Sequence, residues 1–332
     1  MNIFCANSNN LLFIITKSYF TCYTFSTLKK KVINLMEIRA LKYFLAIARE
    51  ENMTKAAETL HISQPALTKQ IHNLEAELGK KLFSRHSFSL ELTAEGKLLQ
   101  KRAEDLLTLA TKITDEFAAL DNSLGGDIYL GSGESYQLRH LAKIIHQFKT
   151  KHPHFHYHLI SGDTEQVTEK LNKGLLDFAI IFEEPDLKHY NALSFPQADT
   201  WGVLMSTTAP LAKKSEITWE DLKELPLFCS EQSWKEDIPR WCGTKIKELN
   251  LEGTYRLVYN ASVFAKEGLG YVLAFNHIVD ISPGSGLVFR PLSPKLETKM
   301  YIIWKKDQVF TPIAERFKEL LENTLPSVHK KA

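Results

Sequence analysis

The chain has 332 residues, 44% of them hydrophobic and 24% charged, and this length allows two globular domains of about 150 residues each. Such a composition excludes a collagen, a mucin and a fully disordered chain. The formal charge is only +2, so any affinity for nucleic acid must come from a local arrangement of charge rather than from the whole surface.

Residues 1–35 form a leader of distinct character. Their apolar run, Leu11–Ile15, is much shorter than the roughly 20 residues of a membrane span. A signal peptide carries its basic residues before the apolar run, whereas here Lys29–Lys31 follow it. We therefore expect a leader that is poorly ordered or untranslated, with Met36 as the true start, and no association with a membrane.

Two helices are predicted directly after the leader. Apolar residues at spacings of three and four residues predict an amphipathic helix over 38–48. Asn52 lies where an N-cap belongs, before a short second helix that ends near Leu60.

A third helix is predicted to follow Ser63, which can cap it. Pro65 falls in its first turn, where the missing N–H costs nothing, and Gly79 is a natural end. Its buried stripe is expected to contain Leu67, Ile71, Leu74 and Leu78. Two helices joined by a short turn, with another helix bracing them, form a helix-turn-helix.

The polar face of the third helix suits the major groove of DNA. Gln64, Thr68, Lys69 and His72 lie opposite the apolar stripe, and positions 59–74 contain no acidic residue. Gln can pair with adenine, Lys can reach guanine or phosphate, and the Thr methyl group can contact thymine. The alternative interpretation is an ordinary solvated helix face.

A basic hairpin is expected after the third helix. Positions 78–90 contain four Lys, Arg and His residues, Arg85 among them, and no acidic residue. Residues 88–92 alternate like a short strand. This pattern predicts a wing that contacts phosphates.

A long helix with a heptad seam is predicted beyond Thr93. Its apolar residues alternate at spacings of four and three: Leu99, Ala103, Leu106, Ala110, Ile113, Phe117 and Leu120. The helix could pack on its own domain. Its position after a DNA-binding unit favours pairing of two subunits, which would present two reading heads to two DNA half-sites.

The remainder of the chain has the sequence pattern of an α/β protein. Past a polar hinge at 121–126, strands and helices alternate, which predicts a parallel sheet with right-handed crossovers. A second unit is expected from about Ala198, with helices over 219–225 and 238–249. A final helix is expected over 311–325.

Residues 36–93 closely resemble the DNA-binding domain of the LysR-type transcriptional regulators. The residues that carry the resemblance are Leu41–Phe44, Thr54–Ala57, Leu60–Ile71, Leu74-Glu75, Leu78-Gly79, Leu82–Arg85 and Leu92–Gly96. The rest of the chain matches the family more loosely, at Gly131, Pro153, Gly162, Gly174–Asp177 and Gly268–Gly270.

The resemblance implies an α+α/β fold class in three parts. A winged helix-turn-helix is expected over 36–93, a dimerising linker helix over 94–121, and an effector-binding domain like a periplasmic binding protein over 127–330. Lobe I of that domain is expected at 127–197 and 276–330, and lobe II at 198–275.

The resemblance also implies the partners of the protein. They are double-stranded DNA, a small-molecule effector and further copies of the chain, as a homodimer through the linker helix and a homotetramer built from two dimers. The role also allows contact with RNA polymerase.

The family's pattern assigns DNA binding to six residues, which are Ser63, Gln64, Pro65, Thr68 and Lys69 on the recognition helix and Arg85 on the wing. Two positions depart from the pattern. Lys69 stands where arginine is common, and lysine cannot form a planar bidentate fork. Phe88 stands where a second cation is usual in the wing, so we expect one phosphate contact fewer and a shallower salt dependence.

An effector site is expected at the carboxyl ends of the strands, where helix N-termini present amide groups. The candidate residues, the last placed by the family topology, are Ser132, Glu134, Ser135, Thr164, Ser230 and Phe275. Ser135 and Thr164 could donate hydrogen bonds to a ligand, cap their helices, or do both. The charge of Glu134 disfavours an anionic effector and favours a cationic or neutral one.

A run of alternating histidines offers a possible metal site. His152, His154, His156 and His158 would share one face of a strand. Zinc could use such a set, but neighbours along one strand converge poorly on a tetrahedral ion, so a polar strand face is favoured and no metal is expected.

The four cysteines and the missing catalytic motifs bear on the class of protein. Cys5, Cys22, Cys229 and Cys242 lack the spacing of a disulfide framework or a zinc site, which predicts a reducing, cytoplasmic location. Cys229 and Cys242 could form a redox switch, although buried inert thiols are favoured. The sequence has no nucleophile elbow and no P-loop. We therefore expect a regulator rather than an enzyme or transport-associated binding protein, with no catalytic residues and no cofactor.

Overall fold

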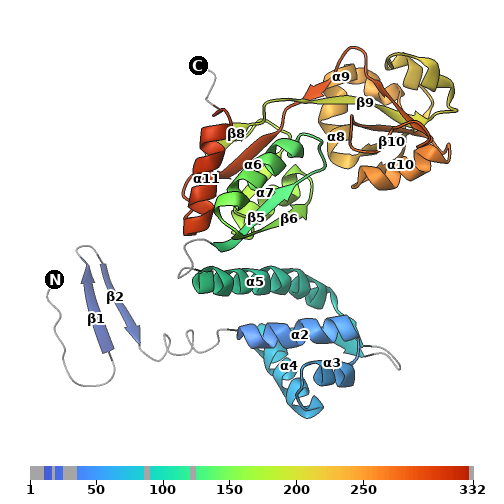
Figure 1. Cartoon of the computed structure of the whole chain (residues 1–332). Coiled ribbons are helices and arrows are strands. Elements are labelled where there is room, and N and C mark those ends of the chain that lie inside the picture. Colours follow the sequence, from blue (N-terminus) through green and yellow to red (C-terminus); the bar gives the residue numbers. More distant parts are fainter. Residues whose placement is uncertain (1–10, 17–18, 25–35, 86–89, 120–124, 329–332) are drawn as a thin grey trace. The chain divides into compact units, whose positions relative to one another are not determined.

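A computed structural model describes residues 11–16, 19–24, 36–85, 90–119 and 125–328. The chain divides into two units, Met1–Thr111 and Lys112–Ala332 (Figure 1). No helix in the described ranges has the length and apolar character that crossing a membrane requires.

The described part of the leader is an antiparallel pair of strands. Strand β1 (Leu11–Thr16) pairs with strand β2 (Tyr19–Thr24). The sequence analysis expects a leader that is poorly ordered or untranslated and does not predict this hairpin. Its residues are mainly aromatic, β-branched and aliphatic, and aromatic and β-branched side chains favour strands.

The three helices of the predicted helix-turn-helix are confirmed. They are α2 (Ile38–Glu50), α3 (Met53–Thr59) and α4 (Gln64–Leu78). The predicted caps are also present. Asn52 accepts hydrogen bonds from the backbone N–H groups of Thr54 and Lys55 at 2.9 and 3.0 Å. Ser63 Oγ accepts from the N–H of Ala66, and Gly79 ends α4 with a φ of 65°.

One apolar cluster holds the three helices together. Its fully buried members include Leu41, Phe44, Ile47, Leu67, Ile71, Leu74 and Leu82. The prediction for Leu78 is wrong, because this side chain is 39% exposed. It lies at the last residue of α4, where the chain leaves the core.

A short hairpin follows α4. Strand β3 (Phe83–Arg85) pairs antiparallel with β4 (Leu90–Leu92). The predicted wing is therefore present, and its tip at 86–89, which includes His86 and Phe88, lies outside the described residues.

Helix α5 (Ala94–Ala119) carries the predicted heptad seam. The seam residues near the start of the helix are packed in a core, whereas most of those further along are exposed. Leu99 and Ala103 pack into the core of the first unit. Leu106, Ile113 and Phe117 are 45%, 47% and 69% exposed. The first part of the helix thus packs on its own domain, and the second part presents apolar side chains to solvent. Leu120 lies outside the described residues.

Lobe I is a five-stranded sheet with the order β6-β5-β7-β15-β8. Its strands are β5 (Gly125–Ser132), β6 (His154–Ser161), β7 (Phe178–Ile181), β8 (Tyr190–Ser194) and β15 (Tyr301–Lys305). Its helices are α6 (Leu138–Lys151), α7 (Thr164–Asn172) and α11 (Pro312–Thr324). The predicted parallel pairing holds for β5 with β6 and β7, whereas β15 runs antiparallel to its neighbours β7 and β8.

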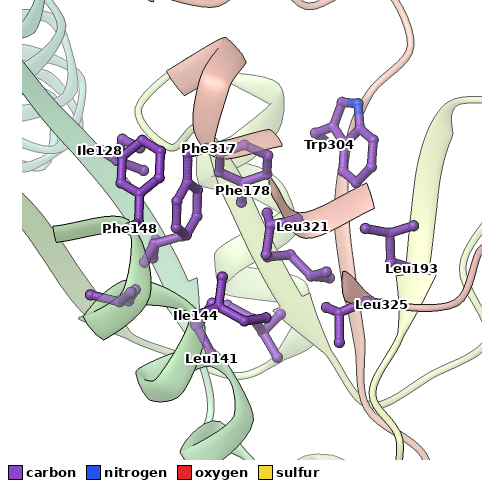
Figure 2. Packing of buried hydrophobic residues seen from close by; sticks show 14 of the residues in the cluster. Ile128, Leu141, Ile144, Phe148, Phe178, Leu193, Trp304, Phe317, Leu321 and Leu325 are labelled. Carbon is purple, nitrogen blue, oxygen red and sulfur yellow. The ribbon is translucent and has the colours of Figure 1, made fainter. Parts of the chain in front are cut away.

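The helices bury both faces of this sheet. Figure 2 shows the face covered by α6 and α11, where Phe148 and Phe317 pack edge to face at 5.2 Å between ring centroids. Helix α7 covers the other face with Val167 and Leu171. Burial on both faces explains the continuous apolar run of β7, Phe178–Ile181.

Lobe II is a second sheet with the order β11-β10-β12-β9-β13, with β14 paired to β9. Its strands are β9 (Asp199–Ser206), β10 (Pro226–Ser230), β11 (Asn250–Tyr255), β12 (Tyr271–Phe275), β13 (Leu287–Pro291) and β14 (Glu297–Thr298). Its α-helices in the described chain are α8 (Glu231–Lys235), α9 (Asp237–Cys242) and α10 (Val258–Lys266). The predicted two-lobed α/β architecture is confirmed.

Two predictions for lobe II are wrong, and one helix was missed. The segment 219–225 forms only a short 3-10 turn, Glu220–Leu222, which ends before Pro226. The helix predicted over 238–249 ends at Cys242, because Gly243 adopts a φ of 59° and a 3-10 turn follows. Helix α10 was not predicted.

The predicted return to lobe I at residue 276 is also wrong. Strand β13 pairs with β9 in the sheet of lobe II, and β14 still pairs with the start of β9. The chain therefore re-enters lobe I only between β14 and β15. The sequence of the loop after β12 does not indicate which of the two sheets the next strand joins.

Cys229 and Cys242 are buried free thiols. Burial raises the pKa of Cys229 and of Cys242. Because the thiolate is the reactive form, this environment disfavours redox chemistry at either residue.

A buried ion pair anchors the end of α5 in the second unit. Lys112 Nζ lies 2.8 Å from Asp177 Oδ1 and donates to the carbonyl of Gly174 at 3.2 Å. Asp177 Oδ2 accepts from the N–H of Tyr129 at 2.7 Å. Lys112 and Asp177 are each only 6% exposed, and Glu116 is more distant at 3.8 Å. The pair therefore joins α5, β5 and the turn after α7.

Replacing Asp177 is expected to destabilise the second unit. Asp177→Asn leaves the Lys112 ammonium buried beside a neutral amide, which costs about 3–5 kcal/mol of unfolding free energy. Urea unfolding of the intact protein, with hydrogen exchange to locate the effect in 112–332, measures it. Glu116→Gln is the control and should cost less than about 1 kcal/mol, because its contact is long and partly exposed. Equal losses in the two variants would contradict this role of Asp177.

Candidate functional site

Helix α4 presents a polar face that its capped N-terminus holds in place. Gln64, Pro65 and Lys69 are exposed, and Thr68 is half-buried. Leu67, one position before Thr68, is fully buried in the core. The structure therefore brings these predicted residues together on one side of α4.

Two side chains of this face are already joined. Gln64 Nε2 donates a hydrogen bond to Thr68 Oγ1 at 3.0 Å, one helical turn away. Such a bond limits the rotamers of both side chains before any partner arrives. Ser63 caps the helix with its hydroxyl, so its position has a structural role as well.

A buried carboxylate that sequence reasoning missed fixes the start of the wing. Glu75 Oε1 accepts from the N–H of Leu82 at 2.9 Å, and Glu75 Oε2 lies 2.6 Å from Lys81 Nζ. Burial acts to raise the Glu75 pKa, but the hydrogen bonds from Lys81 and Leu82 outweigh it, so the pKa lies below its ordinary value. Glu75 therefore ties the end of α4 to the strand that leads to Arg85.

The predicted wing cation has a defined backbone position. Arg85 is the last residue of β3, paired with Leu90 of β4. Its side chain lies outside the described part of the chain.

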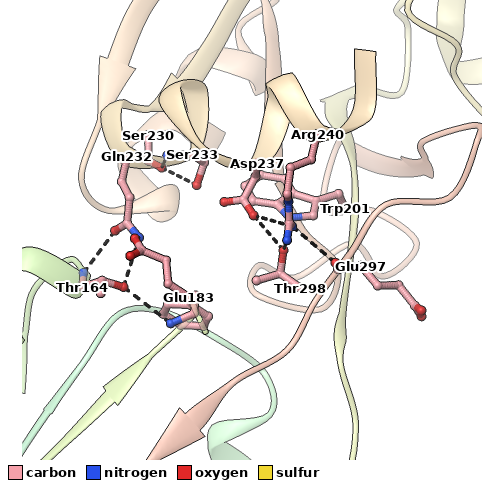
Figure 3. A network of polar contacts seen from close by, with 11 residues as sticks. Thr164, Glu183, Trp201, Ser230, Gln232, Ser233, Asp237, Arg240, Glu297 and Thr298 are labelled. Atoms are coloured by element: carbon pink, nitrogen blue, oxygen red, sulfur yellow. Dashed lines mark hydrogen bonds and ion pairs between the residues drawn. The ribbon is translucent and has the colours of Figure 1, made fainter. Parts of the chain in front are cut away.

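The two lobes meet through a set of polar contacts (Figure 3). Thr164, the first residue of α7, donates its N–H to Gln232 Oε1 at 3.1 Å and accepts from Gln232 Nε2 at 3.0 Å. The same amide donates to Glu183 Oε1 at 2.8 Å. Thr164 does not cap α7, because Asp163 does so. The Thr164 hydroxyl thus serves the contact between lobes.

A second group of contacts joins the loop after β5 to lobe II. Ser135 Oγ donates to Asp199 Oδ2 at 2.5 Å. Glu134 Oε2 accepts from the N–H of Val258, the first residue of α10, at 2.7 Å. Asp199 and the Val258 amide were not among the predicted residues, because their approach depends on how the two lobes pack.

The remaining predicted residues have local partners. Ser132 donates to the carbonyl of Gly133 at 2.8 Å. Ser230 caps α8 and bonds to Ser233. Phe275 contacts aromatic rings of both lobes, with ring centroids 4.4 Å from Trp201 and 5.6 Å from Phe182.

Burial raises the pKa of two carboxylic acids at the boundary of the lobes. It raises the pKa of Asp199 to about 6, against the opposing effects of Ser135 and Gln137 hydrogen bonds and the Arg139 charge. Burial also raises the pKa of Glu183, and the carboxylates of Glu236, Asp237 and Asp163 add to the shift.

The strands that join the lobes are braced by a polar network. Trp201 Nε1 donates to Thr298 Oγ1 at 2.9 Å, and Thr298 in turn donates to Asp237 Oδ1 at 2.9 Å. Arg240 lies 2.8 Å from the same carboxylate oxygen (Figure 3). The network ties α9 to β9 and β14 at the crossing point.

The alternating histidines belong largely to strand β6. His158 Nε2 lies 2.7 Å from Asp127 Oδ1, and its ring stacks on Tyr129. The strand exposes His154, His156 and His158. Across the described residues, no three His, Cys, Asp or Glu side chains are grouped as ligands of one ion.

Two family models match the chain. Residues 38–97 match a model described as "Bacterial regulatory helix-turn-helix protein, lysR family", and residues 121–326 match "LysR substrate binding domain". The first range contains α2 to α4 and the wing, and the second contains nearly all of both lobes.

Relatives and solved structures extend over most of the chain. The Hca operon transcriptional activator HcaR of Escherichia coli is 26% identical over 88% of this chain and 99% of its own. The HTH-type transcriptional regulator YtlI of Bacillus subtilis is 28% identical over 77% of this chain and 83% of its own. The crystal structure of CbnR, a LysR family transcriptional regulator, superposes with a TM-score of 0.70 at 22% identity, over 87% of this chain and 99% of CbnR.

Removal of the Glu75 carboxylate is expected to loosen the wing. Glu75→Ala leaves the buried N–H of Leu82 without its acceptor, which costs about 1–3 kcal/mol of unfolding free energy. Since the Glu75 pKa is lowered, the difference from wild type should be full above the ordinary value of 4.5 and shrink as the pH falls below it.

Chemical unfolding at several pH values, with hydrogen exchange over 36–85, measures this difference. Glu77→Ala, at an exposed site of the same helix, is the matched control and should change little. A pH-independent difference between Glu75→Ala and wild type would show that the carboxylate charge has no part in it.

Proposed function

This chain belongs to the LysR family of DNA-binding transcriptional regulators, and from that premise we propose which of its residues bind DNA and which bind the effector. Helix α4 reads base edges in a major groove, the wing contacts phosphates, and a small molecule bound between the lobes controls the binding. The observation that carries this proposal is the polar, acid-free face of α4, which the capped helix-turn-helix holds exposed.

The DNA-binding roles follow from side-chain chemistry. Gln64 and Thr68, joined by their hydrogen bond, face base edges, where an amide can recognise adenine. Lys69 reaches guanine or phosphate as a point charge. Ser63 and Pro65 set the first turn of α4, and Arg85 neutralises a phosphate from the wing.

The effector site is proposed at the boundary of the lobes. Thr164 and Ser135 offer polar groups that now meet Gln232 and Asp199. A ligand that replaces these partners would change the contacts between the lobes. Ser132, Glu134, Ser230 and Phe275 complete the proposed set around it. Ligand and DNA affinities would then be coupled.

Pairing of two chains is proposed through α5. Leu106, Ile113 and Phe117 are exposed at heptad spacing, and a second copy of the helix would bury them. The dimer presents two α4 helices to two half-sites. We further propose that two dimers assemble into a tetramer. We also propose a cytoplasmic location and contact with RNA polymerase, as expected for a transcriptional regulator of this family.

We assign the parts of the chain as the sequence predicts them, except for the lobe boundary. The DNA-binding domain is 36–93, the linker helix is 94–121 and the effector domain is 127–330, after a leader at 1–35.

Two single substitutions should separate base reading from phosphate contact. Gln64→Ala should change the sequence preference, with a loss of about 1–3 kcal/mol on the preferred operator. Arg85→Ala should weaken binding to all duplexes similarly and lower the slope of log affinity against log salt by about one.

Fluorescence anisotropy with the upstream DNA of the protein's own gene and a set of base-substituted duplexes measures both effects. Lys235→Ala removes a cation in lobe II that pairs with Glu231 and is the matched charge control. Identical preference, affinity and salt slope for wild type, Gln64→Ala and Arg85→Ala would refute the assignment.

A further inference from the structure

Three carboxylates between the lobes have neutral hydrogen-bond partners. Glu134 accepts from a backbone amide of α10, Glu183 accepts from the Gln232 side chain, and Asp199 accepts from the Ser135 hydroxyl. None of the three carboxylates forms an ion pair with a Lys or Arg of the described chain, unlike Glu75 and Asp177. Asp199 is only 2% exposed, and a carboxylate that loses water without meeting a cation favours the arrival of one. Glu134 is half-buried and Glu183 is exposed beside it at the boundary of the lobes.

A buried amide beside them is only partly satisfied. Gln137 is 7% exposed, and its side chain donates to Asp199. The other end of this amide, Oε1, is buried and has no hydrogen-bond donor in the described structure. Because a buried acceptor without a donor costs free energy, the site lacks an N–H or O–H group at this point.

The nearby guanidinium groups contact other residues, although one buried N–H of Arg139 has no hydrogen-bond partner in the described structure. Arg139 acts on Asp199 through its charge, but it donates to Gln197 Oε1 and lies 4.7 Å from the ring centroid of Tyr136, with its Nε buried and unpaired. Arg240 lies against Asp237. Around Glu183, the charged groups that act are further carboxylates. The boundary of the lobes therefore has an excess of negative charge.

Aromatic rings lie in the same region. Phe275 of lobe II bridges Trp201 and Phe182, the latter directly before Glu183 in the chain. Aromatic faces attract organic cations and also accommodate their apolar part. The side chains thus combine negative charge, a free acceptor and aromatic surface.

We propose that the effector of this chain is a small organic cation with a primary ammonium or guanidinium group, bound by Asp199, Glu183 and Gln137 between the lobes. This inference rests on the proposed function, because it names the ligand class of the proposed effector site. Glu134 adds its charge from the N-terminus of α10. A dicarboxylate of similar length is repelled by the same groups and is not bound there.

The test compares matched cations and anions on the intact protein. The probes are 1,4-diaminobutane and agmatine against succinate and adipate, each titrated to millimolar concentration. Thermal unfolding and calorimetry report binding, because a ligand of the folded state raises Tm. We expect saturable binding of at least one of the two cations and of neither dicarboxylate.

Substitutions locate the binding. Asp199→Asn and Glu183→Gln should each weaken the cation by about tenfold or more, since each removes a charged hydrogen-bond acceptor. Glu231→Gln, an exposed glutamate of lobe II paired with Lys235, is the matched control and should bind as wild type does. The Tm of each variant without ligand confirms that it is folded.

Arg139→Gln distinguishes the opposite possibility. It should leave cation binding intact or strengthen it, whereas it should abolish binding of an anion that pairs with Arg139. Binding of neither cation to wild type, binding of a dicarboxylate instead, or full cation affinity in both carboxylate variants would overturn the inference. None of these results bears on DNA binding, so the proposed DNA-binding function is tested separately by the measurements on Gln64→Ala and Arg85→Ala.

Discussion

A carboxylate that is removed from water must find hydrogen-bond donors, and three parts of this molecule depend on how that constraint is met. Glu75 meets Lys81 and the N–H of Leu82, which fixes where the wing begins. Asp177 meets Lys112 and the N–H of Tyr129, which anchors the last turns of α5 in the effector unit. These two carboxylates are matched by cations. Between the lobes, Glu134, Glu183 and Asp199 meet neutral donors, and there the contacts can be exchanged for those of a ligand.

Local signals predicted the DNA-binding domain of the chain well. Asn52, Ser63 and Gly79 cap or end the helices that the sequence assigns to them, because a cap needs only neighbours within a few residues. The same approach failed in lobe II, where Gly243 ends a helix that the apolar spacing extends further. It also placed the return to lobe I too early, because the pairing of β13 with β9 joins segments about 80 residues apart.

The candidate sites also differ in whether local sequence patterns or contacts between distant residues form them. The polar face of α4 follows from helical periodicity alone, so Gln64, Thr68 and Lys69 were predictable. The pairing of Lys112 with Asp177 spans 65 residues of sequence and has no periodic signature. Asp199, Gln232 and Gln137 became visible only once the two lobes were folded against each other. Among the predicted effector residues, Thr164 and Ser135 of lobe I form hydrogen bonds with Gln232 and Asp199 of lobe II. Ser230, in contrast, caps helix α8.

The net charge of +2 gives this chain little unspecific attraction to DNA, so recognition must depend on the face of α4 and on the wing. The most direct measurement is the affinity of the intact protein for its own upstream DNA and for a scrambled duplex of equal composition, across a range of salt concentrations. We expect log affinity to fall linearly with log salt for both duplexes, with the upstream DNA bound about a thousandfold more tightly or better. Equal affinity for the two duplexes at every salt concentration would contradict sequence reading by α4.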